Sequence, residues 1–535
     1  MANKYVSTAG GGDGSSAIAP MTLKQAMAEC LSGTTYILAA GTYTQSAGAN
    51  EWMIDTKAPA ALVTFKSASG VAADVIITND GSAWQGSLYL YKSTNFAFED
   101  ITFDAGSGAA ANYAAYLRAD AIAASVLTFT RCNFIDDLAG KMAIEIESTS
   151  ALLTLTMTNC NVTVSSTCRG LFAYAASIAT LTITGGTWTH TGSNGSLLDV
   201  RSAAQVKVSG VTFDSTQPTG DIVSFKATAA SSRLSITGCT VIGRAANGNW
   251  AIYAADYWTN VYIANNSIFS LNNADPVGLA GICCGYDADT TANPMGQVIV
   301  HDNLVQSTGS TAHSSHGMLL GSGADGAQFY NNTILLCTEA GSGVNIGMVF
   351  KAERCIVHHN IITGSRGLLC KGASYSNISY NTIKALETYA ISIDPGATNT
   401  IPSKCNNFEN NIIDATAGTY AIYENQIFGA GGDPIDNRFD FNCYFLGTAK
   451  AGYFGSDKAD LAALKTYWAA VTNTLWILND ANSIVADPQL SGTFTLGAAS
   501  PCLNAGRPTP GSGLTTIGAW QRRQGNVCTP IAMNL

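Results

Sequence analysis

The sequence predicts an all-β fold, a parallel β-helix solenoid of about thirteen rungs, from three observations. A short motif recurs along most of the chain. Each copy contains two or three strands of three to six residues in which apolar and polar side chains alternate. No helical periodicity appears between residues 60 and 450. A repeat of about 20–30 residues built only from short strands is typical of a solenoid whose rungs pair with one another.

The repeat is a short strand that ends in a polar pair, often with Asn, followed by a β-branched or aromatic residue. MTNCNV and VHHNII are two copies. The first and last closing residues lie 341 residues apart over twelve intervals, a mean near 28. We expect like residues to stack inside the solenoid, and the Asn side chains to form a ladder that bonds to backbone groups of neighbouring rungs. The closing residues are Phe103, Phe134, Val162, Trp188, Phe213, Val241, Ile268, Val305, Ile334, Ile362, Ile383, Ile413 and Tyr444.

The two ends of the chain differ from the repeats, and we expect them to cap the solenoid, because an open terminal rung is an edge for aggregation. Residues 1–60 are assigned to an N-terminal cap with the first rung, 61–450 to the β-helix, and 451–535 to a C-terminal helix with an irregular capping segment. Residues 20–31 predict a helix cap with Thr22 and Gln25 as its capping box. Residues 456–471 predict a second helix with Asp457 as N-cap.

Composition disfavours several classes of partner. Lys and Arg number 27 against 37 Asp and Glu, and the net charge of −10 argues against nucleic acid. Hydrophobic residues make up 47% of the chain, which supports a large core and rules out disorder. No apolar run reaches the roughly 18 residues that span a bilayer, and the first residues contain no apolar signal-peptide core. We therefore expect no membrane insertion.

The fourteen cysteines contain no CxxC pair and no Cys/His pattern at zinc spacing. Most of them lie within strand-like segments. Free cysteine is a small residue that buries readily, so we expect inward-pointing thiols and assembly in a reducing compartment.

Both ends of the chain carry a resemblance. The opening YVSTAGGGDG, with APMTLKQAMAEC and TTYILAAGTYT, resembles the start of right-handed parallel β-helix proteins of the pectate-lyase-like superfamily. The closing ADPQL, FTLGAASPCLNAG and IGAWQ resemble the C-terminal segment common in that group. The resemblance implies a right-handed parallel β-helix over essentially the whole chain. It leaves the activity open, since the superfamily contains polysaccharide lyases, glycoside hydrolases, epimerases, phage tailspikes and non-catalytic adhesins.

The first catalytic hypothesis is β-elimination of an acidic polysaccharide. Five of the six histidines and several cations fall between residues 283 and 371. The resemblance implies a Lys or Arg base with Ca²⁺ or Arg against the uronate carboxylate. Lys351 and Lys371, 20 residues apart, are expected to stack on one face. The candidate catalytic residues are Lys351, Arg354, Lys371 and His316.

The second catalytic hypothesis is glycoside hydrolysis, which uses two carboxyl groups. Glu145 and Glu147 are two residues apart on a predicted strand and therefore face the same way. Their Cβ atoms are expected about 7 Å apart, and facing outward they could serve as acid and base. Repulsion between the two carboxylates would raise the pKa of one of them.

Further residues are candidates for binding. The stretch NWAIYAADYW is the densest aromatic segment of the chain, and it offers Trp250, Tyr257 and Trp258 as a platform for sugar rings, with Arg366 as an additional substrate-binding residue. Asp287, Asp289 and Asp302 supply the oxygen ligands that Ca²⁺ prefers, and calcium is the one cofactor that these residues suggest.

Two functions from different classes remain open. The first is binding and cleavage of an extended acidic cell-surface polysaccharide by a phage tailspike-like protein, with lyase chemistry favoured over hydrolysis. The second is a non-catalytic virion spike, fibre or decoration protein, or an adhesin. In either case we expect a virion or extracellular protein whose partners are a polysaccharide and other virion proteins. A homotrimer is common among spikes of this fold, although no coiled-coil heptads specify one.

Overall fold

The computed structural model of the chain confirms a parallel β-helix. The part of the chain that it describes makes about 12 turns, close to the predicted thirteen rungs, and contains two α-helices. It describes residues 2–45, 52–79, 86–106, 113–118, 124–138, 140–147, 152–165, 167–173, 178–192, 195–201, 203–215, 221–243, 250–270, 280–285, 295–307, 316–336, 345–394, 403–424, 437–470, 480–492, 494–509 and 513–518.

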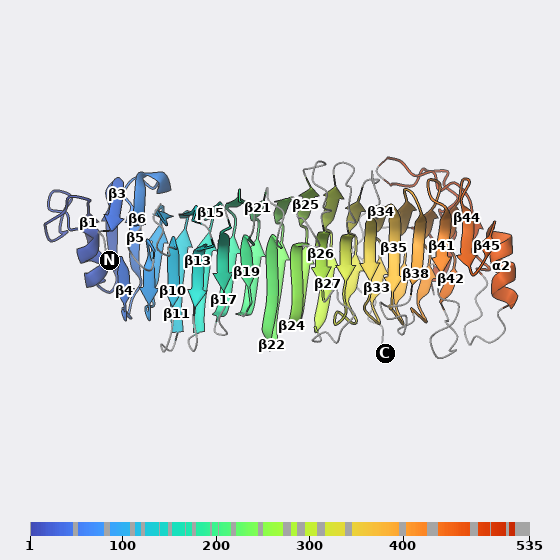
Figure 1. Cartoon of the computed structure of the whole chain (residues 1–535), viewed down its shortest axis with the longest axis horizontal. Coiled ribbons are helices and arrows are strands. Elements are labelled where there is room, and N and C mark those ends of the chain that lie inside the picture. Colours follow the sequence, from blue (N-terminus) through green and yellow to red (C-terminus); the bar gives the residue numbers. More distant parts are fainter. Residues whose placement is uncertain are drawn as a thin grey trace. The chain divides into compact units, whose positions relative to one another are not determined.

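The chain divides into two compact units, unit 1 (Met1–Leu271) and unit 2 (Asn272–Leu535). Each unit contains three series of strands, and each strand pairs in parallel with the strand of the same series one rung away. Figure 1 shows the strands of a series side by side within each unit.

In unit 1 the first series contains β4 (Met53–Asp55), β7 (Tyr89–Tyr91), β10 (Ala115–Arg118), β13 (Met142–Glu147), β16 (Arg169–Ala173), β19 (Leu198–Val200) and the first parts of β22 (Val223–Thr237) and β24 (Trp250–Ala264). The second contains β1 (Ala2–Val6), β2 (Thr34–Leu38), β5 (Val63–Ser67), β8 (Phe96–Glu99), β11 (Ala124–Thr130), β14 (Leu152–Thr158), β17 (Ile178–Thr184), β20 (Ala203–Ser209) and the later parts of β22 and β24. The third contains β3 (Gly41–Gln45), β6 (Val75–Asn79), β9 (Thr102–Asp104), β12 (Asn133–Asp136), β15 (Asn161–Val164), β18 (Thr187–His190), β21 (Thr212–Ser215), β23 (Thr240–Gly243) and β25 (Ser267–Ser270).

In unit 2 the first series contains β26 (Ala280–Cys284), β29 (His316–Leu320), β32 (Ile346–Phe350), β35 (Arg366–Lys371), β38 (Tyr389–Asp394), β41 (Tyr420–Glu424) and β44 (Lys450–Phe454). The second contains β27 (Gln297–His301), β30 (Gln328–Tyr330), β33 (Ile356–His358), β36 (Asn377–Ser379), β39 (Asn407–Glu409) and β42 (Arg438–Asp440). The third contains β28 (Leu304–Ser307), β31 (Thr333–Leu335), β34 (Ile361–Gly364), β37 (Thr382–Ala385), β40 (Ile412–Asp414), β43 (Cys443–Phe445) and β46 (Ile484–Val485). Short additional elements are η1 (Ala72–Asp74) in unit 1 and β45 (Asp457–Lys458), β47 (Gly506–Thr509) and β48 (Gly513–Thr515) in unit 2.

The sequence repeat corresponds to the third series. All thirteen closing residues lie in its strands and are buried, and within each unit they are Cα partners from rung to rung. Two earlier copies escaped the sequence pattern: Tyr43 pairs with Ile77, and Ile77 pairs with Phe103. The closing residue of each rung therefore marks a column of the apolar core.

The predicted Asn ladder is confirmed in unit 2. Each amide of the ladder sits two residues before a closing residue and donates from Nδ2 to Oδ1 of the Asn on the next rung, at 3.0–3.2 Å. In every rung before Asn442, the backbone N–H of the Asn donates to the same oxygen of the next rung. Nδ2 also donates to a backbone carbonyl, such as that of Phe329 for Asn360. The fully buried amides are thereby satisfied within the corner. The ladder contains Asn303, Asn332, Asn360, Asn381, Asn411 and Asn442.

The residue before each ladder position has a positive φ, close to 55°, which turns the chain between the second and third series. This explains the polar pair of the repeat, since Asn and Asp adopt this left-handed conformation more readily than most residues, and glycine adopts it freely. Examples are Asn159 (φ 52°) and Gly238 (φ 63°) in unit 1, and Asn331 (φ 54°) in unit 2.

The N-terminal helix forms, whereas its role as a cap of the solenoid is not confirmed. Helix α1 (Leu23–Glu29) begins after Thr22 and has the predicted capping box with Gln25. Strand β1 precedes this helix and already pairs in parallel with β2, so the solenoid begins before the helix.

The C-terminal helix α2 (Leu461–Ala470) packs against a stack of aromatic rings at the end of the second series. The ring of Trp468 stacks on Phe439 with centroids 5.9 Å apart, and Phe439 stacks on Phe408 at 4.6 Å. The predicted N-cap is wrong: Asp460, rather than Asp457, accepts the N–H of Ala463. Asp457 instead lies in β45 and pairs with Lys450, because the strand extends further than the helical pattern suggested.

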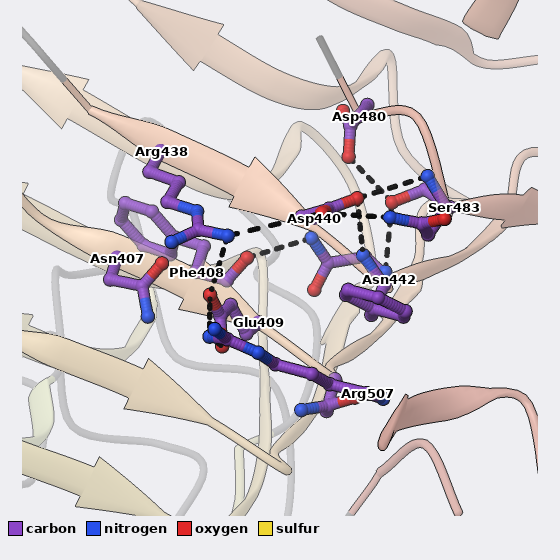
Figure 2. A network of polar contacts seen from close by, with 12 residues as sticks. Asn407, Phe408, Glu409, Arg438, Asp440, Asn442, Asp480, Ser483 and Arg507 are labelled. Atoms are coloured by element: carbon purple, nitrogen blue, oxygen red, sulfur yellow. Dashed lines mark hydrogen bonds and ion pairs between the residues drawn. The ribbon is translucent and has the colours of Figure 1, made fainter. Parts of the chain in front are cut away.

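The irregular C-terminal segment closes the corner ladder and attaches to the outer side of the solenoid. Asn442, the last amide of the ladder, donates its N–H to Ser483 Oγ at 2.8 Å, and Ser483 in turn donates to Asp480 (Figure 2). Arg507 reaches back to Glu409 with two hydrogen bonds of 2.8 Å, and Arg438 contacts the same carboxylate at 3.3 Å.

Candidate functional site

The outer side of the first series in unit 2 carries the chemistry-bearing residues. Gly317, Gly347 and Gly367 occupy its inner corner, where a Cβ atom would come within 2.3–2.5 Å of the Ile side chains of the third series. Because only glycine fits there, the strand bends, and the residue before each glycine lies on the outer side. Those residues are His316, Ile346 and Arg366.

Four tyrosines and two cations gather on β35, β38, β41 and β44. We call this set, together with Lys371, Ser392 and Asp394, the tyrosine face. Its aromatic and cationic members are Tyr389, Tyr420, Tyr423, Tyr453, Arg366 and Lys450. The rings of Tyr389 and Tyr423 stack with centroids 4.3 Å apart, and those of Tyr423 and Tyr453 at 5.1 Å. All four tyrosines are half-buried, and the Tyr420 hydroxyl donates to Asp457 Oδ1 at 2.7 Å.

Arg366 lies at the edge of the tyrosine face. Its Cζ atom lies 5.3 Å from the centroid of the Tyr389 ring, a cation–π contact. Its Nε atom is buried and has no hydrogen-bond acceptor among the residues that the structure describes. An arginine with an unused Nε donor among the described residues, next to an aromatic ring, is suited to a planar anion such as a carboxylate.

Lys371 and Asp394 form the other side of the tyrosine face. They are Cα partners on adjacent rungs, and Ser392 Oγ lies 3.3 Å from Asp394 Oδ2. Burial raises the pKa of Asp394, and the charges of Arg366 and Lys371 oppose this increase. Arg366 and Lys371 therefore both act on the Asp394 carboxylate, although they are five residues apart in the sequence.

The structure brings part of the predicted lyase set together. Phe350 and Cys370, the residues before Lys351 and Lys371, are Cα partners on adjacent rungs. The two lysines therefore lie one rung apart, and the stacking of their side chains stays a prediction. His316 lies on the same side of the first series, two rungs before Arg366. Arg354 does not join them, because it lies in the turn before β33, where its side chain is 68% exposed and pairs with Glu353 at 3.6 Å.

The predicted hydrolase pair lies on the first series of unit 1. Glu145 and Glu147 both face outward from β13, beside Tyr116 and Arg118 of β10. Burial raises the pKa of Glu145, and a hydrogen bond from Tyr113 partly offsets this. Glu147 accepts a hydrogen bond from Tyr116 and lies 4.0 Å from Arg118. Glu145 therefore holds its proton to a higher pH than an ordinary glutamate does, whereas Glu147 has Arg118 as a cationic neighbour.

The next rungs of unit 1 continue this outer face. Phe172 is the Cα partner of Glu145, and Asp199 is the partner of Phe172. Asp199 contacts Arg169 at 3.7 Å and Arg201 at 3.2 Å, and both guanidinium groups lie over the Phe172 ring. These two arginines therefore form ion pairs with a protein carboxylate.

The predicted aromatic platform is wrong for Trp258 and weakened for Trp250. Trp258 is fully buried in the core of unit 1, where Nε1 donates to the Phe225 carbonyl at 3.3 Å, so its ring is not available to a sugar. Trp250 lies on the outer side but is only 5% exposed. Tyr257 is half-buried. A left-handed residue at Asp256 (φ 69°) turns the chain there and directs Trp258 inward.

Of the three predicted calcium ligands, only Asp302 lies among the described residues, so the calcium site stays a prediction. Asp287 and Asp289 lie outside the described residues. Asp302 contacts His301 Nδ1 at 2.5 Å and accepts from Asn331 at 3.1 Å. Within the described ranges, no group of three or more His, Cys, Asp or Glu side chains could hold a metal ion.

Sequence reasoning missed the tyrosines and Asp394. It concentrated on the histidine-rich stretch that ends at residue 371, whereas the partners of Arg366 and Lys371 lie on the next two rungs. The length of the repeat could have revealed these residues. Adding one interval to Lys371 reaches the strand YAISID, which supplies both Tyr389 and Asp394.

One family profile matches part of the chain. The profile of the family described as periplasmic copper-binding protein (NosD) matches residues 286–430, which is less than half of the chain. No curated protein gives a significant match. No helix among the described residues is long and apolar enough to cross a membrane.

Several solved structures are similar. A pectate lyase, Pel9A, is 15% identical with a TM-score of 0.25, and the match covers 97% of this chain and 96% of that one. A tailspike protein of bacteriophage CBA120 is 13% identical with a TM-score of 0.31, covering 81% and 61%. A PL6 family polysaccharide lyase from Pseudopedobacter saltans is 10% identical with a TM-score of 0.32, covering 93% and 97%.

Proposed function

We propose that the protein binds an extended acidic polysaccharide on the tyrosine face of unit 2 and cleaves it by β-elimination. The observation that carries this proposal is Arg366, whose Cζ atom lies 5.3 Å from the centroid of the Tyr389 ring and whose buried Nε has no hydrogen-bond acceptor among the described residues. A uronate carboxylate supplies the bidentate acceptor that this group lacks. Sugar rings pack on the neighbouring tyrosines, which offer both apolar surface and hydroxyl groups.

The residues of the tyrosine face can be given roles in the reaction. Arg366 pairs with the uronate carboxylate and stabilises the enolate that forms when C5 loses its proton. Lys371 removes this proton as the general base. The electron pair of the C5–H bond becomes the C4=C5 double bond, the C4–O4 bond breaks, and O4 takes a proton. Tyr423 is the proposed donor, because it is the Cα partner of Ser392 on the next rung of the tyrosine face.

The test is incubation of the full chain with a panel of acidic polysaccharides, recording the ultraviolet absorbance of unsaturated uronates together with reducing ends. We expect both signals to rise. Arg366→Gln is expected to abolish them while the protein remains folded. Arg354→Ala is the matched control, since it removes an exposed cation of the same unit that lies off the tyrosine face. Equal losses in both variants would contradict the proposal.

A second candidate is hydrolysis by Glu145 and Glu147 in unit 1. The observation that favours it is the raised pKa of Glu145 next to an outward-facing carboxylate two residues away. Glu145 then acts as the acid and Glu147 as the base, at the spacing of an inverting pair. Reducing ends without ultraviolet absorbance, lost in Glu145→Gln, would select this chemistry.

The setting that we propose is a phage virion, where a tailspike-like homotrimer binds host polysaccharide. The low content of charged residues in this β-helix and its buried thiols support such a structural role. The mass of the purified protein in solution tests the trimer. If no polysaccharide of the panel is cleaved, the remaining candidates are a non-catalytic virion spike, fibre or decoration protein, or an adhesin. Added chelator tests calcium, which Asp287, Asp289 and Asp302 were predicted to bind.

A further inference from the structure

Two thiols that are far apart in the sequence pack together at the C-terminal end of unit 2. Cys443 is the first residue of β43, and Cys502 belongs to the irregular segment that follows the solenoid. Both are fully buried in one apolar cluster with Ile412, Leu496 and Ile517. Each thiol shifts the pKa of the other, that of Cys443 upward and that of Cys502 downward.

This pair differs from the other neighbouring thiols of the chain. Cys132 and Cys160 also contact each other, but they occupy adjacent rungs that the backbone already joins through the Asn161 N–H and the Cys132 carbonyl. Cys443 and Cys502 instead connect a rung to a segment that, within its described residues, takes no part in the parallel ladders.

The segment around Cys502 is held mainly by side chains. Arg507 binds Glu409 through two hydrogen bonds, and its backbone N–H donates to Asn410 Oδ1 at 2.7 Å (Figure 2 shows the Arg507–Glu409 pair). The Gly518 N–H donates to the Asn410 carbonyl at 2.8 Å. A segment attached in this way opens at lower free energy than a rung in the middle of the ladder.

We propose that Cys443 and Cys502 are a thiol-modification site, where a low-molecular-weight disulfide such as oxidised glutathione converts the pair into a disulfide that fastens the C-terminal segment to the solenoid. The segment opens first, since both sulfurs are buried in the closed form. The closed disulfide constrains the unfolded chain over the whole loop from residue 443 to residue 502, and such loop closure stabilises a fold.

The exchange proceeds in two balanced steps. The Cys443 thiol lowers the pKa of Cys502, which makes Cys502 the first nucleophile. Its thiolate attacks one sulfur of oxidised glutathione, the S–S bond of the reagent breaks, and one glutathione leaves. The Cys443 sulfur then loses its proton and attacks Cys502 of the mixed disulfide, releasing the second glutathione. The protein loses two protons and two electrons, and oxidised glutathione gains both and becomes two thiols.

The experiment is peptide mapping of the full chain by mass spectrometry under non-reducing conditions, after equilibration in oxidised and in reduced glutathione. We expect a linked peptide that contains Cys443 and Cys502 in the oxidised sample only. This readout needs no variant and does not depend on folding of a mutant. A dominant link between any other cysteines, or no link at full oxidant, would overturn the proposal.

Thermal unfolding adds a second readout. We expect the oxidised protein to melt about 5 °C or more above the reduced protein. Cys443→Ser and Cys502→Ser should each abolish this difference. Cys239→Ser is the matched control, because Cys239 is equally buried but lies in unit 1. A difference that persists without Cys502 would also overturn the proposal.

Discussion

Unit 1 and unit 2 build the same corner of the β-helix from different side chains. In unit 2 the position two residues before each closing residue is an asparagine whose amide joins the rungs above and below. In unit 1 the same position mostly holds small or apolar residues. They are Ile101, Cys132, Cys160, Gly186, Val211 and Cys239, followed by Asn266.

The difference shows that the corner can be held by two kinds of interaction. The thiol of Cys160 donates only weak hydrogen bonds to the carbonyls of Phe129 and Thr158, at 3.4 and 3.6 Å, so packing holds the corner of unit 1. In unit 2 each amide depends on its two neighbours, and a buried polar chain is stable only when all of its members are satisfied. We therefore expect unit 2 to be the less tolerant of substitution at this position.

The units also differ on the outer face of the first series. Unit 1 presents paired carboxylates and arginines that already have a carboxylate partner, whereas unit 2 presents the tyrosine face with Arg366 and Lys371. The largest expected effect tests which face is catalytic. Lys371→Ala should lower the rate of β-elimination by about 100-fold or more, because the general base is lost. Initial rates of ultraviolet absorbance measure this.

The comparison variant for that prediction is Glu145→Gln in unit 1. It should leave β-elimination within about twofold of the unchanged protein, since no residue of unit 1 takes part in the proposed reaction. If Glu145→Gln abolishes cleavage and Lys371→Ala does not, the catalytic face lies in unit 1 and the lyase proposal fails.

The next largest effect concerns the corner ladder. Asn360→Ala should destabilise unit 2 by about 3–4 kcal/mol, because the Asn332 donors and the Phe329 carbonyl lose their partners in a buried site. Cys160→Ala, at the same position of unit 1, should cost only about 1–2 kcal/mol of packing. Denaturant unfolding measures both changes, with the exposed Asn260→Ala as a control that should shift nothing. Equal costs in the two units would refute the contrast.

A third prediction concerns pH. Burial raises the pKa of Glu424 in unit 2 to about 8 and that of Asp136 in unit 1 to about 7. The folded state therefore retains protons that the unfolded state releases above its ordinary carboxyl pKa. The stability that each protonated carboxyl contributes is complete below the ordinary pKa of that group in the unfolded state. It decreases as pH rises and levels off near pH 7 for Asp136 and near pH 8 for Glu424.

The variants Glu424→Gln and Asp136→Asn test this prediction. Each should flatten the dependence by up to about 1.4 kcal/mol per pH unit within its own window. Denaturant midpoints between pH 5 and pH 9 provide the measurement. Stability that rises with pH over this range in the unchanged protein would contradict the sign.

The smallest effect concerns the left-handed residue before the ladder. Unit 1 has glycine there in three successive rungs, whereas unit 2 has Asn331 and Tyr380 at equivalent places. A Cβ atom at Gly238 would meet nothing closer than 4.0 Å, so Gly238→Ala should cost only about 1 kcal/mol of backbone strain. Gly238→Asn should cost less, because Asn tolerates this conformation. A loss of several kcal/mol in either variant would show that the corner of unit 1 depends on more than φ.

Part of the candidate site follows from the sequence and part does not. The 20-residue step from Lys351 to Lys371 equals one rung, so their placement on adjacent rungs could be predicted once the repeat was recognised. The separation of Arg354 could not, because the left-handed turn at that residue (φ 56°) carries its side chain around the corner. Trp258 illustrates the same limit, since aromatic density does not tell which side of a strand faces the core.

By itself, the sequence determined the parallel β-helix, its rung length and the corner ladder, since the same residue types recur at the same step and stacked rungs must repeat their environment. Only the tertiary structure decided which side chains meet across rungs. Arg366, Tyr389 and Asp394 come together because the lengths of the intervening turns set the register, and Cys443 meets Cys502 because the C-terminal segment folds back on the solenoid. Local periodicity carries no information about these long-range contacts.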